Sequence, residues 1–204
     1  MSATEITTLF VLCAAMSFSP GPNTTMATAL AANGGMRQAL RFCIAVPAGW
    51  SLMMMACGFG LGALVLGSPP LRMGIKLLGI GYMVWLAWKL SRAAQLASVD
   101  ARRLNVGFWN GVGLQFVNIK AWMLALTLTA GWVVSAAGQP ANNPVQRVGI
   151  ICAVMLVFGL TSCLTYALMG ALLRGFLAQG QRLLWFNRVL ALVLLLTAAW
   201  MATV

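Results

Sequence analysis

The stretch Ser19-Pro20-Gly21-Pro22-Asn23 interrupts the first long hydrophobic segment of the chain and predicts a helix that is broken at membrane depth. Because proline carries no amide hydrogen, Pro20 and Pro22 leave the carbonyls of Met16 and Phe18 without their usual helical donors. The helix that resumes after the prolines presents unpaired N–H groups near residues 23–25. Each such group costs roughly 2–7 kcal/mol in hydrocarbon, so we expect these groups to face protein or the path of a solute.

The composition is that of an integral membrane protein. Of the 204 residues, 61% are hydrophobic and only 7% are charged, whereas a soluble domain carries about 25% charged residues. We expect an all-α membrane protein that forms one transmembrane domain over residues 1–204, and a first segment that is a retained span rather than a signal peptide. Six segments are long enough to cross about 30 Å of hydrocarbon as helices, namely 5–31, 39–66, 71–90, 106–134, 148–173 and 183–204.

The basic residues are divided unevenly between the two sides of the membrane that these spans define. The side that follows the first, third and fifth spans holds Arg37, Arg41, Lys89, Arg92, Arg102, Arg103, Arg174, Arg182 and Arg188. The opposite side holds Arg72, Lys76 and Arg147. By the positive-inside rule the larger set is cytoplasmic and both chain ends lie outside. The net charge of +11 therefore indicates topology and contact with membrane lipid, rather than a nucleic-acid partner.

Few residues are suited to acid–base catalysis or to metal binding. The chain has no histidine, two carboxylates (Glu5 and Asp100) and five cysteines without Cys-x-x-Cys spacing. A protein metal site needs several such ligands together, and acid–base catalysis commonly uses histidine or a pair of carboxylates. We therefore expect no metal, no cofactor and no enzymatic activity.

The polar loop at residues 91–105 divides the chain into two halves, about 1–98 and 104–204, of three spans each. Because three is odd, equivalent halves would enter the membrane from opposite sides, as the inverted repeats of alternating-access transporters do. The proline break of the first half and the polar cluster Asn118-Ile119-Lys120 of the second lie about 18–23 Å from the starts of their spans, at 1.5 Å per residue. We therefore expect two inverted three-helix repeats, with the two polar features flanking the middle of the membrane.

Lys120 is a charge that no reasonable adjustment of the spans moves to a membrane surface, and its burial costs roughly 2.5–3.5 kcal/mol. It either supplies a cation for a substrate carboxylate, or donates to the free carbonyls at the first break and locks two helices together. Asn23 and Asn118 either orient a substrate or cap the local helix ends. Hydroxyls of the fifth span, at Thr161, Ser162, Thr165 and Tyr166, either line the path or bond to their own helix.

Three motifs resemble the lysine exporter and homoserine/threonine exporter family: Ser19-Pro20-Gly21-Pro22-Asn23 with Gly35-Met36-Arg37, then Trp85-Leu86-Ala87-Trp88-Lys89, and Val117-Asn118-Ile119-Lys120-Ala121-Trp122. The resemblance covers nearly the whole chain. It implies a bacterial inner-membrane exporter of amino acids, driven by the proton gradient, with broken first and fourth helices around the path. Ile119 stands where the family usually has proline, which weakens the expectation that the fourth helix is discontinuous here.

We therefore predict an exporter of small, neutral amino acids or close derivatives that works by alternating access. The substrate carboxylate would take N–H groups near residues 23–25 together with Lys120, and the ammonium would take the carbonyl of Met16 or Phe18. A passive channel for small polar solutes and a structural subunit that transports nothing are the alternatives, and a homo-oligomer is left open. The predicted substrate-binding residues are Pro20, Gly21, Pro22, Asn23, Thr24, Asn118 and Lys120, and the predicted path-lining residues are Thr25, Thr161, Thr165 and Tyr166.

Overall fold

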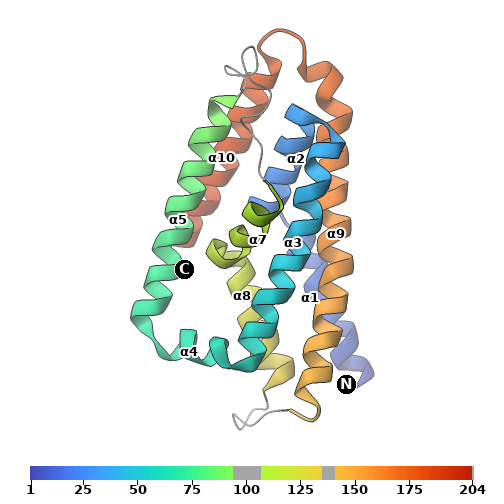
Figure 1. Ribbon diagram of the computed structural model, residues 1–204, viewed down its shortest axis with the longest axis vertical. Helices are drawn as coiled ribbons and strands as arrows, with labels where there is room; N and C mark the ends of the chain where they lie inside the picture. Colours follow the sequence, from blue (N-terminus) through green and yellow to red (C-terminus); the bar gives the residue numbers. More distant parts are fainter. Residues whose placement is uncertain (94–106, 135–140, 204) are drawn as a thin grey trace.

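The computed structural model describes residues 1–93, 107–134 and 141–203, and these residues form helices joined by short connections (Figure 1). One of the elements, η1, is a kink at which Phe59 and Gly60 leave the helical conformation, and another, η2, is a wider helical turn. In chain order the elements are α1 (Ala3–Phe18), α2 (Pro22–Gly34), α3 (Met36–Ala56), η1 (Cys57–Leu61), α4 (Gly62–Gly67), α5 (Pro69–Ser91), α7 (Phe108–Val117), α8 (Ile119–Leu128), η2 (Thr129–Val133), α9 (Pro144–Leu177) and α10 (Arg182–Thr203).

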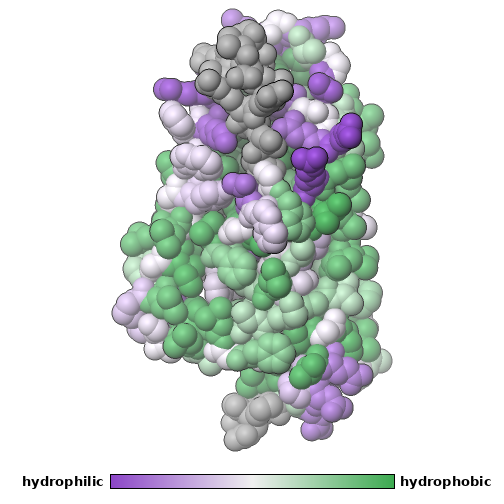
Figure 2. Space-filling view, in the orientation of Figure 1, coloured by the Kyte–Doolittle hydropathy of each residue, from purple (hydrophilic) through white to green (hydrophobic). Residues whose placement is uncertain are grey.

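Within the described residues, four helices are long and apolar enough to cross a membrane, and two bent helix pairs raise the number to six if each pair is one span. The four are Met36–Gly67, Pro69–Ser91, Pro144–Leu177 and Arg182–Thr203. The bent pairs are Ala3–Phe18 with Pro22–Gly34, at 48°, and Phe108–Val117 with Ile119–Val133, at 68°. Hydrophobic residues cover the middle of the face shown in Figure 2, and hydrophilic residues gather toward its two ends. An all-helical membrane architecture is confirmed, with four to six spans.

The first helix is broken where the prolines predict it, between Phe18 and Pro22. The fourth predicted span is also broken, although no proline is present, and it bends more sharply than the first. At this second break Asn118 leaves the helical conformation (φ −90°, ψ 101°). The indole N–H of Trp122 donates to the carbonyl of Phe116 at 2.8 Å, so a side chain replaces a lost backbone donor. Substitution of isoleucine for the family's proline therefore does not restore a continuous helix.

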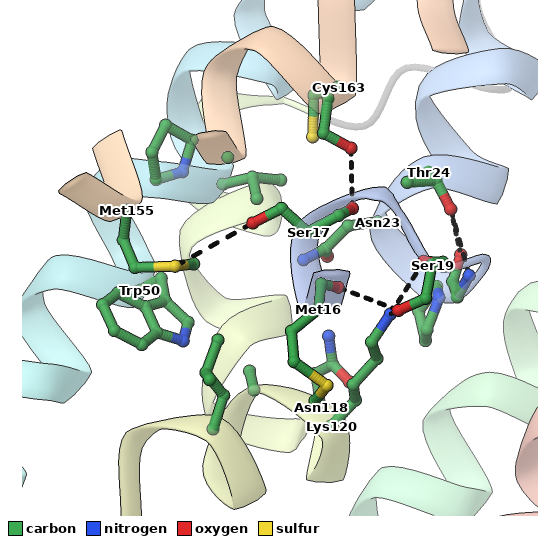
Figure 3. Close-up of a pocket in the computed structure, with 18 residues that line it drawn as sticks. Met16, Ser17, Ser19, Asn23, Thr24, Trp50, Asn118, Lys120, Met155 and Cys163 are labelled. Carbon is green, nitrogen blue, oxygen red and sulfur yellow. Dashed lines mark hydrogen bonds between the residues drawn. The ribbon is translucent and has the colours of Figure 1, made fainter. Parts of the chain in front are cut away.

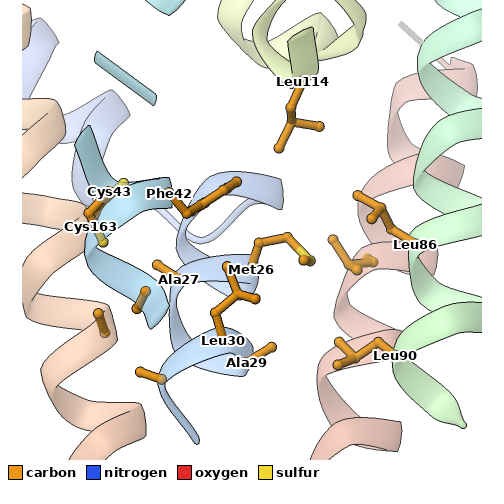
Figure 4. Packing of buried hydrophobic residues seen from close by; sticks show 14 of the residues in the cluster. Met26, Ala27, Ala29, Leu30, Phe42, Cys43, Leu86, Leu90, Leu114 and Cys163 are labelled. Carbon is orange, nitrogen blue, oxygen red and sulfur yellow. The ribbon is translucent and has the colours of Figure 1, made fainter. Parts of the chain in front are cut away.

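The short helix α2 lies at the centre of the molecule, and its residues 24–32 are all buried. Figure 4 shows Met26 and Leu30 of α2 between Phe42 of α3 and Leu86 of α5. On the side of α9 the approach is closer still, because a Cβ at Gly170 would overlap the carbonyl of Thr28. The packing therefore holds the second half of the broken first span inside the protein, away from the outer surface.

The two ends of the molecule differ in their basic content. Figure 1 places the ends of α2, α5 and α9 and the start of α10 at one end, and the N-terminus, α4 and the start of α9 at the other. The described residues of the larger basic set, on the side predicted to be cytoplasmic, lie at the end that holds the start of α10. Arg102 and Arg103 of that set lie outside the described residues. The side of the membrane that each end faces stays a prediction.

Candidate functional site

The carbonyl groups that precede the first break all accept hydrogen bonds from side chains. Two of the donors come from α9 and one from α8, so the break is tied to helices far away in the sequence. Since an unpaired buried carbonyl costs about 1–3 kcal/mol, these bonds stabilise the break substantially. Ser19 Oγ donates to Met16 O (3.0 Å), Ser162 Oγ to Ser17 O (2.7 Å), Tyr166 Oη to Phe18 O (3.0 Å) and Lys120 Nζ to Ser19 O (2.8 Å).

Lys120 directs its ammonium at the chain segment of the break. Its Nζ donates to Ser19 O at 2.8 Å and to Ser19 Oγ at 2.7 Å, and it lies 3.5 Å from Pro20 O. The side chain passes so close to Gly21 that a Cβ there would lie 3.3 Å from Nζ. This is the geometry of the second alternative, in which Lys120 links the two broken spans.

No carboxylate among the described residues pairs with the Lys120 ammonium. Glu5 is bound to Arg147, with Oε1 2.9 Å from Nη1. Asp100 lies outside the described residues. Lys120 therefore brings a positive charge into the interior, where its neighbours in the structure are neutral oxygens and carbon.

The start of α2 provides further donors. Thr24 Oγ1 accepts from Gly21 N and donates to Gly21 O, both at 3.0 Å, which caps the helix. The first backbone bond of α2 runs from Thr25 N to Gly21 O. Within the described residues, the backbone N–H groups of Asn23 and Thr24 are thus left without a helical acceptor, as the first turn of a helix requires. These donors and the helix dipole favour an anion at this point.

The side chain of Asn23 is held by a residue that the sequence analysis did not select. Its amide forms a reciprocal pair with Gln115 of α7, at 3.0 and 3.1 Å. Gln115 is fully buried, and it also donates to the carbonyl of Gly111 at 3.1 Å. The pair links the two broken spans a second time and leaves the side chain of Asn23 with partners on both its oxygen and its nitrogen.

A cavity of about 60 Å³ lies beside both breaks, between α1, α2, α3, α8 and α9. This volume exceeds the 10–15 Å³ or so that one water molecule needs. Trp50 lies on one side of the cavity, and Asn118 and Lys120 of the second break lie together on another (Figure 3). Among the described residues, Asn118 Oδ1 and Trp50 Nε1 are buried with no hydrogen-bond partner, one an acceptor and the other a donor. The cavity therefore offers a cation, free helix N–H groups, one free acceptor and one free donor.

A comparison with known protein families decides the class of this site. The model of the LysE type translocator matches residues 14–203, which is nearly the whole chain. The chain belongs to the LysE type translocator family. It is therefore a multi-pass membrane transporter and not an enzyme. The resemblance that the sequence motifs carry is confirmed.

Several curated relatives of this LysE type translocator are named cysteine/O-acetylserine efflux proteins. The one from Salmonella typhimurium (strain LT2) is 33% identical over 183 residues, which cover 89% of each chain. The one from Klebsiella pneumoniae is 28% identical over 188 residues, 91% of this chain and 92% of the relative. The one from Escherichia coli O9:H4 (strain HS) is 27% identical over 199 residues, 97% of each. No solved structure matches the chain.

The structure of this translocator brings most of the predicted binding residues together. Gly21, Pro22, Asn23, Thr24, Asn118 and Lys120 line the cavity. Pro20 lines a second cavity, of about 410 Å³, which lies between the first break and α10. Met16, Ser19 and Lys120 line both cavities, so the lysine and the break separate them.

The predicted path-lining residues lie elsewhere. Thr25 is buried within α2. Thr161 and Thr165 are exposed on α9, and their hydroxyls bond to carbonyls of their own helix at 2.7 and 2.8 Å. Tyr166 is half-buried and bonds to the first break. None of these four residues lines the cavity, and a role for them in the path stays a prediction.

Two residues of the site were missed by the sequence analysis, Trp50 and Gln115. Trp50 lies near the middle of the predicted second span, whereas tryptophan in membrane helices usually lies at the ends, near the headgroups. Gln115 is a polar side chain at membrane depth, which normally faces the interior or a cavity. Both positions could have been recognised by their depth alone, but their partners could not.

Proposed function

We propose that the protein exports small, neutral amino acids or close derivatives across the bacterial inner membrane, with cysteine and O-acetylserine as the first candidates. The observation that carries the proposal is the Lys120 ammonium, which lies beside a cavity at two helix breaks without a carboxylate partner among the described residues. A substrate carboxylate would neutralise that charge. The names of the curated relatives support this choice of cargo.

The carboxylate would lie at the start of α2, where the N–H groups of Asn23 and Thr24 are free and Lys120 is close. In the structure Lys120 is bound to Ser19, and its flexible side chain has three donors, so it can exchange a neutral carbonyl for a carboxylate. Hydrogen bonds to charged groups are stronger than those between neutral groups, about 1.5–3 kcal/mol against 0.5–1.5 kcal/mol. The exchange would loosen the link between the two broken spans, which couples binding to movement of the breaks.

The ammonium would lie at Asn118 rather than at the carbonyls of the first break. Met16 O and Phe18 O, the acceptors expected from the sequence, already receive bonds from Ser19 and Tyr166. Asn118 Oδ1 lines the same cavity and has no donor among the described residues. An ammonium there would satisfy a buried acceptor that otherwise costs about 1–3 kcal/mol.

Alternating access would use the two halves, about 1–98 and 104–204, as inverted repeats. Support comes from the breaks themselves, since the first span of each half is a pair of helices bent at a break. Transporters of this kind bind their substrates near the middle of the membrane, between discontinuous helices. Both chain ends would lie outside, on the evidence of the basic residues, and the proton gradient would drive export, as in the family that the motifs resemble.

The test measures counterflow in proteoliposomes that contain the purified protein. Labelled cysteine should accumulate transiently against unlabelled cysteine and saturate with concentration. A passive channel would show neither behaviour, and a structural subunit would show no flux at all. Either result would overturn the proposal.

Lys120→Ala tests the carboxylate role, with Lys76→Ala as the control, because Lys76 is a lysine of α5 that lines neither cavity. We expect Lys120→Ala to weaken competition by cysteine about 10-fold or more, which corresponds to the loss of one charged hydrogen bond. Competition by cysteamine, which has no carboxylate, should change much less. If the variant inserts normally and transports cysteine at the wild-type rate, the carboxylate role is wrong.

A further inference from the structure

The indole N–H of Trp50 is an unpaired donor in the wall of the cavity. Trp50 belongs to α3, and its side chain is only 3% exposed. Among the described residues its Nε1 is buried without a hydrogen-bond partner, and the residue lines the 60 Å³ cavity. Figure 3 shows the indole ring with its nitrogen on the edge that faces Met16 and Asn118.

Among the described residues, the two other tryptophans that are not exposed both have a hydrogen-bond partner. Trp122, which is 6% exposed, donates its indole N–H to Phe116 O at 2.8 Å. Trp132 is half-buried, and it donates to Glu5 O at 3.1 Å. A buried indole normally finds such a partner. If Trp50 served packing alone, phenylalanine would fill the space without a buried donor, so the free N–H points to a ligand.

The surroundings of Trp50 indicate which part of a substrate it meets. Figure 3 shows a polar side of the cavity, where Ser19, Asn118 and Lys120 lie, and a more apolar side, where Trp50 lies next to Met155. Charged groups remain on the polar side, because their burial against carbon is far more costly than that of neutral groups. The apolar side therefore receives the substrate's uncharged side chain, and one neutral N–H donor there suits a neutral acceptor.

We propose that Trp50 is a specificity-determining residue whose indole N–H donates to a carbonyl oxygen in the side chain of the substrate. This inference rests on the proposed function, and it adds a preference among the substrates that the protein exports. Side chains with an ester or amide carbonyl, such as that of O-acetylserine, bind better than side chains of the same shape without one. Cysteine, whose sulfur is a weak acceptor, gains less from Trp50 than O-acetylserine does.

The experiment compares O-acetylserine with O-ethylserine, which has the same chain length but an ether in place of the ester, and therefore no carbonyl. Both compete against labelled cysteine in counterflow, with wild-type protein and with Trp50→Phe, which keeps an apolar ring and removes the N–H. Trp132→Phe is the matched control, because it removes an indole N–H that is bound to the carbonyl of Glu5, away from the cavity and from both breaks. A second variant carries benzothienylalanine at position 50, which keeps the bicyclic ring without a donor.

Wild-type protein should prefer O-acetylserine about 3- to 10-fold, as one neutral hydrogen bond predicts. Trp50→Phe and the benzothienyl variant should reduce the preference to about 1, by weakening the binding of O-acetylserine alone. Trp132→Phe should keep the wild-type ratio. If both position-50 variants keep the ratio, or weaken both ligands equally, Trp50 has a packing role and the inference is wrong. Absence of cysteine counterflow by wild-type protein would instead overturn the proposed function, and this inference with it.

Discussion

Replacement of Ser162 by alanine should destabilise the protein by removing one donor from the first break. Ser162 is 1% exposed, and its hydroxyl donates to Ser17 O at 2.7 Å. The variant leaves that carbonyl without its donor, at about 1–3 kcal/mol. Ser17 lines the cavity, so a water molecule can replace part of the bond, and the lower half of this range is expected. The loss of a single methyl-sized hydroxyl creates little empty volume, so the unpaired carbonyl dominates the effect.

The measurement is thermal unfolding of the purified protein in detergent, followed by tryptophan fluorescence. A change of 1 kcal/mol shifts the midpoint of a domain of this size by about 2–4 °C, so Ser162→Ala should lower it by about 2–8 °C. Thr161→Val is the control: Thr161 precedes Ser162, is exposed, and bonds only to carbonyls of its own helix. It should stay within about 0.5 kcal/mol of wild type. Equal shifts for the two variants would refute the view that α9 stabilises the break through its side chains.

Two further changes test the position of α2. Gly170→Ala would press a Cβ against the carbonyl of Thr28, so it should destabilise the protein by about 1–3 kcal/mol in thermal unfolding. Gly175→Ala is the control on the same helix. It has open space around its Cβ, so it should be neutral or slightly stabilising. Asn33 and the fully buried Asn187 form a reciprocal amide pair at 2.9 and 3.0 Å, so either alanine variant should cost about 1–3 kcal/mol. The double variant should cost clearly less than the sum of the two, and additive losses would contradict the pairing.

The membrane class and the position of the first break follow from the local sequence. Proline lacks an N–H group in any environment, and a segment of about 20 apolar residues is long enough to span hydrocarbon wherever it occurs. The depth of Lys120 follows from the same reasoning. Its burial requires partners whatever the fold is, and the structure places it at the wall of the cavity, while its role in binding stays a prediction.

The second break and the site's polar partners depend on the tertiary structure. Asn118 ends α7 without a proline, and the break is supported by Trp122, which bonds to Phe116 O. Asn23, for which we expect contact with a substrate or a capping role, pairs through its side chain with Gln115, 92 residues away in the chain. A local pattern states which groups are unpaired, but not which distant helix supplies their partners.

Sequence alone thus determined that this is a helical membrane transporter with unpaired backbone groups and a cation at depth. Only the packing of α3, α8 and α9 around the first break decided that its carbonyls are bound by side chains, and that Trp50 and Asn118 keep a free donor and a free acceptor in the cavity. The physical reason is that an unpaired backbone group follows from the covalent chemistry of one residue. Its partner is selected by helices whose contacts form only when the chain is folded.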